Sequence, residues 1–294
     1  MPSVVVFSPA KLNLFLAITG RRPDGFHDLV SVVAPIKFGD TLWTEPVANG
    51  ESSLECDDPA VPCDETNLIL RAARLFKESA GEPVAARFVL EKRIPMGAGL
   101  GGGSSNAVAA LLALNRLATS PLGRDALLAL AVKLGSDCPL FLQAAPVVMR
   151  GRGERVERLA PQPCARLSAR RVLIFKPSFG ISTAWAYGWM AAGAPLNYLP
   201  ATEAESRLRG WAEGTEPAEK LLFNNMETPA FTKYLALPSL LERLRTEFDL
   251  AVAMSGSGSA CYALLRDDTP VRAVIGRIQE TWGQHTFIAD TEIV

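Results

Sequence analysis

The sequence predicts an α+β protein of two lobes, on three observations. Its 294 residues are about twice a typical domain length, which favours two separate cores. Strand-like runs open the first part before helical patterns follow, and the second part mixes the two. Hydrophobic residues make up 48% and charged residues 21% of the chain, as in ordinary globular proteins. We place the lobes at residues 1–155 and 156–294, because hydrophobic periodicity is lost over 151–162.

The first lobe is expected to begin with β structure and continue with helices. Strand-like segments are found at 1–7, 11–18, 29–36, 41–45, 52–56 and 84–90. Gly, Pro, Asn or Asp residues separate them. Helical patterns follow Asp64, which we expect to be an N-terminal cap, as far as Gly81. Two further helices are expected over 106–117 and 124–134.

The second lobe alternates strands with helices. A strand is expected at 172–175 and another at the C-terminal end of the chain. Helices are expected around 184–190, 240–248 and 271–281. Near the end, the small-residue turn 255–259 joins two apolar runs, 250–254 and 260–265.

Composition excludes several classes of protein. A formal net charge of −1 gives no basic surface for nucleic acid, and no apolar run reaches membrane-spanning length. The N-terminus does not resemble a secretory signal. Five scattered cysteines without a C-x-x-C pair suggest neither disulfides nor a zinc site, so we expect a cytoplasmic protein. His27 and His285 are too few for a histidine-rich metal centre or triad.

The segment from Pro95 to Ser105 carries the strongest functional signal. Five glycines occupy seven positions of it, between an expected strand and an expected helix. Glycine backbone can adopt positive φ and bring consecutive N–H groups close to phosphate oxygens. The positive end of the following helix would point at the same anion. We therefore expect a phosphate cradle for ATP.

Other interpretations of this segment are less favoured. A flexible linker is rarely enclosed so tightly by a strand and a helix. Gly97, Gly99 and Gly102 satisfy G-x-G-x-x-G, but a dinucleotide fold needs a second parallel strand where 124–134 is predicted to be helical. No lysine follows the glycines as a Walker A loop requires. The cradle belongs to a third kind.

Three motifs together resemble the GHMP kinases, which phosphorylate galactose, homoserine, mevalonate or phosphomevalonate. They are P-x-x-x-G-L-G at 95–101, P-A-K-x-N at 9–13 and G-S-G at 256–258. Segments 8–16, 20–27, 100–106 and 134–141 are most similar to family members that act on 4-diphosphocytidyl-2-C-methyl-D-erythritol in the methylerythritol phosphate route to isoprenoid precursors. The resemblance spans nearly the whole chain and is weakest over 191–246.

The resemblance implies an ATP-dependent transferase that phosphorylates the 2-hydroxyl group of this alcohol. It also implies Mg²⁺ and a two-lobe α+β architecture with the active site in the cleft between lobes. Asp137 would be the catalytic base and Lys11 its catalytic partner. From the residues alone, Asp137 would more often be a helix cap and Lys11 a solvated lysine.

The resemblance assigns the cytidyl and erythritol groups to Asn13, Phe26, His27 and Thr183. The family usually has Tyr where Phe26 stands, so that stacking persists while a phenolic hydrogen bond is lost. Without the resemblance, His27 would be a turn residue next to Asp24 and Gly25. Two nearby aromatic residues either line the substrate cleft or pack in the core: Trp185 and Tyr187.

The resemblance also assigns residues to ATP, and each has a simpler alternative. Asn67 would otherwise be a helix N-terminal residue and Lys92 a solvated charge. Gly256 and Gly258 either close the active site or form a tight hairpin. The expected ATP-binding set is Asn67, Lys92, Pro95, Met96, Gly97, Ala98, Gly99, Leu100, Gly101, Gly102, Gly103, Ser104 and Ser105. Relatives often have Ser where Gly102 stands, so the Mg²⁺ ligand is Ser104, Ser105 or neither.

Three functions therefore stay open at this point: a kinase of the cytidyl alcohol, a GHMP kinase of another small alcohol, and a nucleotide-binding protein without catalysis. A dehydrogenase is a more remote fourth. In each case we expect a small-molecule ligand and a monomer or weak homodimer, without nucleic-acid or membrane partners.

Overall fold

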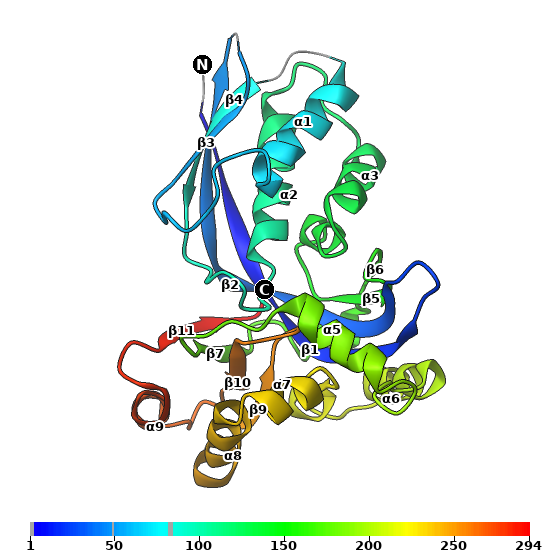
Figure 1. The fold of residues 1–294 in the computed structure, drawn as a ribbon, viewed down its shortest axis with the longest axis vertical. Helices are drawn as coiled ribbons and strands as arrows, with labels where there is room; N and C mark the ends of the chain where they lie inside the picture. The colour runs from blue at the N-terminus through cyan, green and yellow to red at the C-terminus, as the bar shows by residue number, and fades with distance from the viewer. Residues whose placement is uncertain (1–2, 49, 82–84) are drawn as a thin grey trace. The chain divides into compact units, whose positions relative to one another are not determined.

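The computed structural model describes residues 3–48, 50–81 and 85–294, and it confirms the α+β class (Figure 1). The chain divides into two compact units, each built from separate segments. Unit 1 comprises residues 1–10, 38–95 and 101–144, and unit 2 comprises residues 11–37, 96–100 and 145–294. The lobe boundary at 155/156 stays a prediction.

The strands are β1 (Val4–Arg21), β2 (His27–Val47), β3 (Ser53–Cys56), β4 (Ala85–Glu91), β5 (Val147–Gly151), β6 (Arg155–Arg158), β7 (Arg171–Lys176), β8 (Phe223–Asn224), β9 (Ala251–Met254), β10 (Cys261–Leu264) and β11 (Phe287–Glu292). The α-helices are α1 (Leu68–Ala80), α2 (Gly102–Leu117), α3 (Arg124–Leu134), α4 (Pro161–Ala165), α5 (Thr183–Ala192), α6 (Ala201–Glu213), α7 (Glu227–Lys233), α8 (Ala236–Phe248) and α9 (Val271–Trp282). Two 3₁₀ helices are η1 (Cys138–Leu142) and η2 (Ala218–Leu221). In the described part of the chain, no helix has the length and apolar character needed to cross a bilayer.

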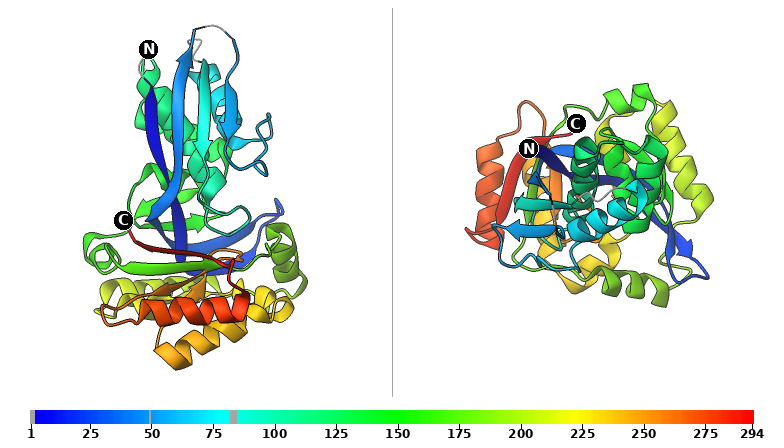
Figure 2. Two further views of the ribbon diagram at one scale, coloured as in Figure 1. Left: turned by 90° about the vertical axis from the view of Figure 1, so that its left-hand side faces the viewer. Right: turned by 90° about the horizontal axis from the view of Figure 1, so that it is seen from above.

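Unit 1 is a sheet with helices on one face, in which the strand order is β3-β4-β2-β1. β2 runs antiparallel to β4, and β3 runs parallel to β4. α1 and α2 lie side by side against the sheet (Figures 1 and 2). Phe76 of α1 and Phe88 of β4 are completely buried, which supplies large apolar surfaces to the core. α1 therefore packs both on the sheet and along α2.

Unit 2 contains a four-stranded antiparallel sheet in the order β11-β7-β10-β9. Leu240 and Leu244 of α8 and Val274 and Ile278 of α9 share a core cluster with its strands. This unit also holds the second part of β1, which pairs in parallel with β8, and the first part of β2, which pairs with β5. The core therefore orders the strand that carries Lys11.

Local patterns placed several elements within a few residues. α3 has the predicted bounds, and β3, β7, α8, α9 and β11 lie where strands and helices were expected. Two pairs of predicted strands are wrong as separate elements: β1 continues through 11–18 and the described part of 1–7, and β2 continues through 29–36 and 41–45. A Cβ at Gly39 would lie 2.2 Å from the backbone oxygen of Ser8, so this glycine permits close strand contact instead of breaking the strand.

Two helix starts also differ from expectation. Asp64 is not the cap of α1, since its carboxylate accepts hydrogen bonds from Thr66, and Asn67 is the N-cap. α2 begins at Gly102, four residues before Asn106. The Gly, Arg, Glu and Pro-rich stretch 151–162 forms part of the β5–β6 hairpin and α4. Parts of the predicted strands 1–7 and 84–90, at residues 1, 2 and 84, lie outside the described residues.

Candidate active site

The first part of the glycine segment, residues 96–100, belongs to unit 2 and packs on the turn between β9 and β10. Gly97 and Gly99 have φ values of 61° and 74°, the left-handed region that glycine tolerates. A Cβ at Gly99 would lie 2.2 Å from the Ser255 oxygen, so this contact requires glycine. Ser255 Oγ donates to the Gly99 oxygen at 3.0 Å. The turn and the glycine segment thus support one another.

The second part of the glycine segment belongs to unit 1 and starts α2. Gly101 is the N-cap, with a φ of 73°, and the Ser105 N–H already bonds to its oxygen. Gly102, Gly103 and Ser104 therefore lie in the first helical turn, where N–H groups lack an intrahelical acceptor. Such groups and the helix dipole favour an anion. Ser105 is buried and accepts a hydrogen bond from Ser8. Its environment therefore differs from that of Ser104, which is only partly buried.

Asp40 organises the base of this helix start and was missed in the sequence. It is completely buried, and its carboxylate accepts from the N–H groups of Arg93 and Ile94 at 2.6 and 2.7 Å. It also accepts from Asn106 Nδ2 at 2.8 Å and pairs with Lys92 at 2.6 Å. In the sequence, Asp40 falls between two predicted strands and resembles an ordinary separating residue, and its four partners lie far along the chain.

Lys92 is therefore not the solvated charge that its neighbours suggested. Its side chain is only 7% exposed, because it pairs with Asp40. A Cβ at Gly102 would lie 3.2 Å from Lys92 Nζ, so the ammonium group lies against the first turn of α2. Lys92 brings positive charge to that helix start, while its contact with ATP stays a prediction.

Lys11 and Asn13 lie next to one another on β1 in unit 2, and both are buried. Lys11 Nζ donates a short hydrogen bond to Asn13 Oδ1. Asn13 Nδ2 donates to Ser31 Oγ at 2.9 Å, while the Asn13 main chain bonds to Ser255 Oγ and to the hydroxyl of Tyr262. A lysine this well buried departs from the solvated behaviour typical of its residue type.

The turn between β9 and β10 lies directly against this pair. A Cβ at Gly256 would lie 3.2 Å from Lys11 Nζ and 3.3 Å from Asn13 Oδ1. Thr183, the first residue of α5, meets the same turn through its hydroxyl, 2.9 Å from that of Ser257. Unit 2 therefore brings together three predicted site residues, Lys11, Asn13 and Thr183, around the turn.

His27, the first residue of β2, is buried between two tyrosines. Its ring centroid lies 4.9 Å from that of Tyr187 and 5.8 Å from that of Tyr198. Burial, with a smaller contribution from Arg21, lowers the pKa of His27, which favours the neutral imidazole. Its Nε2 atom is buried and has no hydrogen-bond partner in the described structure. This nitrogen is suited to bind a polar edge of a ligand.

The neighbouring aromatic residues differ in their roles. Phe26 is half exposed, and the Arg152 guanidinium lies 5.0 Å from its ring centroid. Trp185 packs edge-on against Tyr234, with the Lys233 ammonium 4.3 Å from its ring. Tyr187, by contrast, faces His27. Of Trp185 and Tyr187, Tyr187 is thus the one associated with a predicted site residue.

Asp137 and Asn67 lie in unit 1 at helix starts. Asp137 occupies the N-cap position of η1, but its side chain does not cap that helix within the described residues. Asn67 does cap α1, because its Oδ1 accepts from the Ile69 N–H and its Nδ2 donates to the Pro62 oxygen. Side-chain capping is therefore found at the start of α1 and not at the start of η1. Their roles toward substrate and ATP remain predictions.

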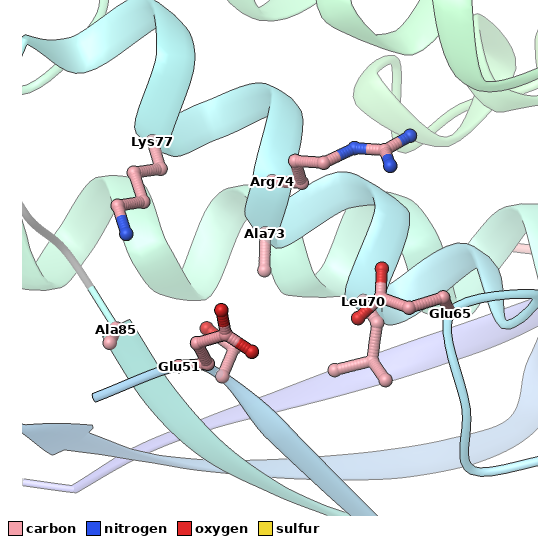
Figure 3. A pocket seen from close by; sticks show the side chains of 8 residues that line it. Glu51, Glu65, Leu70, Ala73, Arg74, Lys77 and Ala85 are labelled. Atoms are coloured by element: carbon pink, nitrogen blue, oxygen red, sulfur yellow. The ribbon is translucent and has the colours of Figure 1, made fainter.

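A pocket of about 360 Å³ lies elsewhere in unit 1, between α1 and the segments around β3 and β4 (Figure 3). Its lining residues are Glu51, Ser52, Glu65, Leu70, Ala73, Arg74, Lys77 and Ala85. None of them is a predicted site residue. In unit 2, another pocket of about 500 Å³ borders α7 and includes Tyr198 and Asn224.

Comparisons with known proteins agree along the chain. The models for the GHMP kinases N terminal domain and the GHMP kinases C terminal match residues 67–144 and 212–284. A 4-diphosphocytidyl-2-C-methyl-D-erythritol kinase of Methylacidiphilum infernorum is 38% identical over 90% of this chain and 87% of its own length. One from Thermus thermophilus is also 38% identical, over 94% of this chain and 93% of its own.

Solved structures give the same picture. A crystal structure of 4-(cytidine 5'-diphospho)-2C-methyl-D-erythritol kinase is 37% identical, with a TM-score of 0.76 and coverage of 98% of this chain and 99% of that one. The mevalonate kinase of Methanococcus jannaschii also has a TM-score of 0.76, covering 100% and 99% of the two chains, but is only 11% identical. The second likeness concerns the fold alone.

Proposed function

Because the chain belongs to the 4-diphosphocytidyl-2-C-methyl-D-erythritol kinases, a family of GHMP kinases, we propose that it phosphorylates the 2-hydroxyl group of that alcohol with ATP. The observation that carries this proposal is the identity of 36–38% with named kinases over 90–98% of the chain. That agreement includes the weakly patterned region 191–246, where the sequence alone matched little. The product enters the methylerythritol phosphate route to isoprenoid precursors.

We assign ATP to the glycine segment. The positive φ of Gly97, Gly99 and Gly101 supports this assignment, because such backbone can present N–H groups to phosphate oxygens. The start of α2 adds positive potential, and Lys92, paired with Asp40, places its ammonium group against the first turn of that helix. The remaining expected contacts, including Asn67, are assigned on family resemblance. Main-chain donors suit a protein whose net charge is −1.

In the proposed reaction, the oxygen of the 2-hydroxyl group forms a bond to the γ-phosphorus, and the bond from that phosphorus to the bridging oxygen of ADP breaks. Asp137 takes the hydroxyl proton. The ammonium group of Lys11 stabilises the negative charge that develops in the transition state. Burial of Lys11 supports this role, because a desolvated charge acts strongly on its surroundings.

We assign the cytidyl group to the surroundings of His27. The unpartnered Nε2 atom and the adjacent ring of Tyr187 support this assignment, since a pyrimidine offers a hydrogen-bonding edge and a face for stacking. Phe26 provides a second, half-exposed ring. Asn13 and Thr183 are assigned to the erythritol part, as their contacts to the β9–β10 turn support.

Mg²⁺ would neutralise charge on the ATP phosphates. Among the described residues, no three or more His, Cys, Asp or Glu side chains form a metal-binding group. A phosphate-bound Mg²⁺ needs only one or two protein ligands, so the residues present fit. Ser104 is the better hydroxyl candidate, because Ser105 is buried and bonded to Ser8. The proposal also includes a cytoplasmic location and a monomeric or weakly dimeric state.

One assay tests the function. Purified protein is incubated with ATP, Mg²⁺ and the cytidyl alcohol, and ADP and the phosphorylated product are followed; matched reactions contain mevalonate or homoserine instead. We expect ADP and product in equal amounts with the cytidyl alcohol alone. Turnover of another alcohol, or ATP binding without any turnover, would contradict the proposal and favour one of the two alternatives.

A further inference from the structure

A short segment at the start of α7 makes an unusual number of bonds to the main chain of unit 2. Asn224, Asn225 and Glu227 each direct side-chain atoms to backbone groups that are distant in sequence. We call these three residues the 224–227 clip. We propose that the clip positions the β9–β10 turn against Lys11 and Asn13 for phosphoryl transfer, an inference that rests on the proposed function.

Asn224 binds the main chain of the β9–β10 turn and of the residue before it. It is 5% exposed, and its Nδ2 donates to the oxygens of Met254 and Gly256 at 2.8 and 2.9 Å. Its Oδ1 accepts from the Met226 N–H at 2.9 Å, which fixes the orientation of the amide. Only an amide supplies two donors and an acceptor in this arrangement, so Asp or Leu cannot replace it.

Glu227 fastens the strand that leads into the same turn. Its Oε1 accepts from the Met254 N–H at 2.8 Å. Together with Asn224 it satisfies both polar groups of the Met254 backbone on the side away from β10. The carboxyl is largely buried, and its desolvation raises its pKa, so an acceptor oxygen matters here more than a negative charge.

Asn225 attaches the clip to β1, the strand of Lys11 and Asn13. Its Oδ1 accepts from the Ile18 N–H and its Nδ2 donates to the Ile18 oxygen, each at 2.9 Å. These two bonds copy the pattern of a strand neighbour beyond the end of β8. The clip therefore binds β1 with one residue and the turn with the others, which sets their relative position.

The clip acts on the site through the orientation of the peptide between Gly256 and Ser257. Asn224 holds the Gly256 oxygen, and in a planar trans peptide the N–H of Ser257 must point to the opposite side. Within the described residues, that N–H donates to no main-chain oxygen. A Cβ at Gly256 would lie 3.2 Å from Lys11 Nζ, so the lysine lies beside this residue. A rotation of this peptide would move a main-chain dipole beside the predicted catalytic lysine.

The test compares Asn224→Asp with Asn115→Asp, a matched control. Asn115 also binds main-chain groups on both sides of its amide, but those belong to Leu122 alone. Turnover of the cytidyl alcohol is measured well below the lowest melting temperature of the set. For Asn224→Asp we expect kcat to fall about 10- to 100-fold, as for small misplacements of reacting groups, with little change in either KM. The control should lose stability and keep its kcat.

A second pair of variants separates positioning from folding. Glu227→Gln keeps an acceptor for the Met254 N–H and should retain kcat, whereas Glu227→Leu lacks it and should lose kcat in the same way as Asn224→Asp. An equal kcat loss in Asn224→Asp and Asn115→Asp at equal loss of melting temperature would overturn the proposal.

Amide hydrogen exchange tests the positioning role of the clip without any substrate. If wild-type protein does not turn over the cytidyl alcohol, the proposed function fails, but the clip still predicts a local effect. Asn224→Asp should speed amide exchange over 255–259 and 11–14 and leave α3 unchanged. Unchanged exchange in the turn would overturn the clip alone.

Discussion

Replacing Gly99 with Ala should disrupt the glycine segment in a way the structure lets us estimate. The new Cβ would lie 2.2 Å from the Ser255 oxygen, and real Cβ contacts stay above 3.0 Å, so one backbone must retreat by about 0.8 Å. The left-handed φ of 74° adds about 1–2 kcal/mol for a residue with a Cβ. Overpacking adds about 1–3 kcal/mol. A displacement near 1 Å beside reacting groups costs about 100-fold in kcat/KM.

Gly81→Ala is the matched control for this substitution. Gly81 ends α1 with a φ of 69°, and a Cβ there meets no atom within 4 Å. It therefore carries the backbone strain without the clash. Melting temperature by calorimetry and kcat/KM for ATP are measured for both variants. We expect a lower melting temperature in both, and lost activity in Gly99→Ala alone. If Gly99→Ala matches Gly81→Ala in both measurements, the close contact with Ser255 is not required.

Three further predictions concern charged groups. Lys11→Ala and Asp137→Ala should each abolish ADP release while calorimetric titration still detects ATP binding; near wild-type kcat in either variant would refute that residue's role. Asp40→Ala should cost about 3–5 kcal/mol of unfolding free energy, because it leaves Lys92 buried without its partner; denaturant unfolding that shows under 1 kcal/mol would contradict this. The pKa of His27 is lowered on folding, so its contribution to stability is present above pH 6.5 and lost as the pH falls below it. His27→Gln should therefore lose less melting temperature than wild type between about pH 7.5 and about pH 5.5, and an equal loss would contradict the assignment.

Local sequence signals predicted the elements whose ends have strong local causes. α3 was placed correctly because Gly135 ends an apolar helical pattern, and the glycine segment was recognised because few other sequences allow three left-handed residues within five positions. The start of α2 was placed too late, because Gly and Ser have low helix propensity. In the structure, these glycines and serines nevertheless form the first turn of α2.

Long-range partners account for what was not predicted. Asp40 and Asn106 are 66 residues apart, and Asn224 and Gly256 are 32 apart. Asp40 and Asn224 are polar residues whose roles depend on partners in another element, a side-chain amide for Asp40 and a main-chain oxygen for Asn224. Periodicity describes which face of an element is apolar, but it does not show which polar side chain finds a buried partner. The roles of Asp40 and the 224–227 clip therefore depend on the three-dimensional structure.

The unmatched nitrogen of His27 has a consequence for selectivity. A buried polar atom without a partner costs a protein about 1–3 kcal/mol, and a molecule that supplies the missing bond recovers it. A molecule of similar shape that places only carbon atoms next to Nε2 leaves this free-energy cost uncompensated. Discrimination between a nucleobase and an apolar ring can thus arise from one atom that the folded chain leaves unsatisfied.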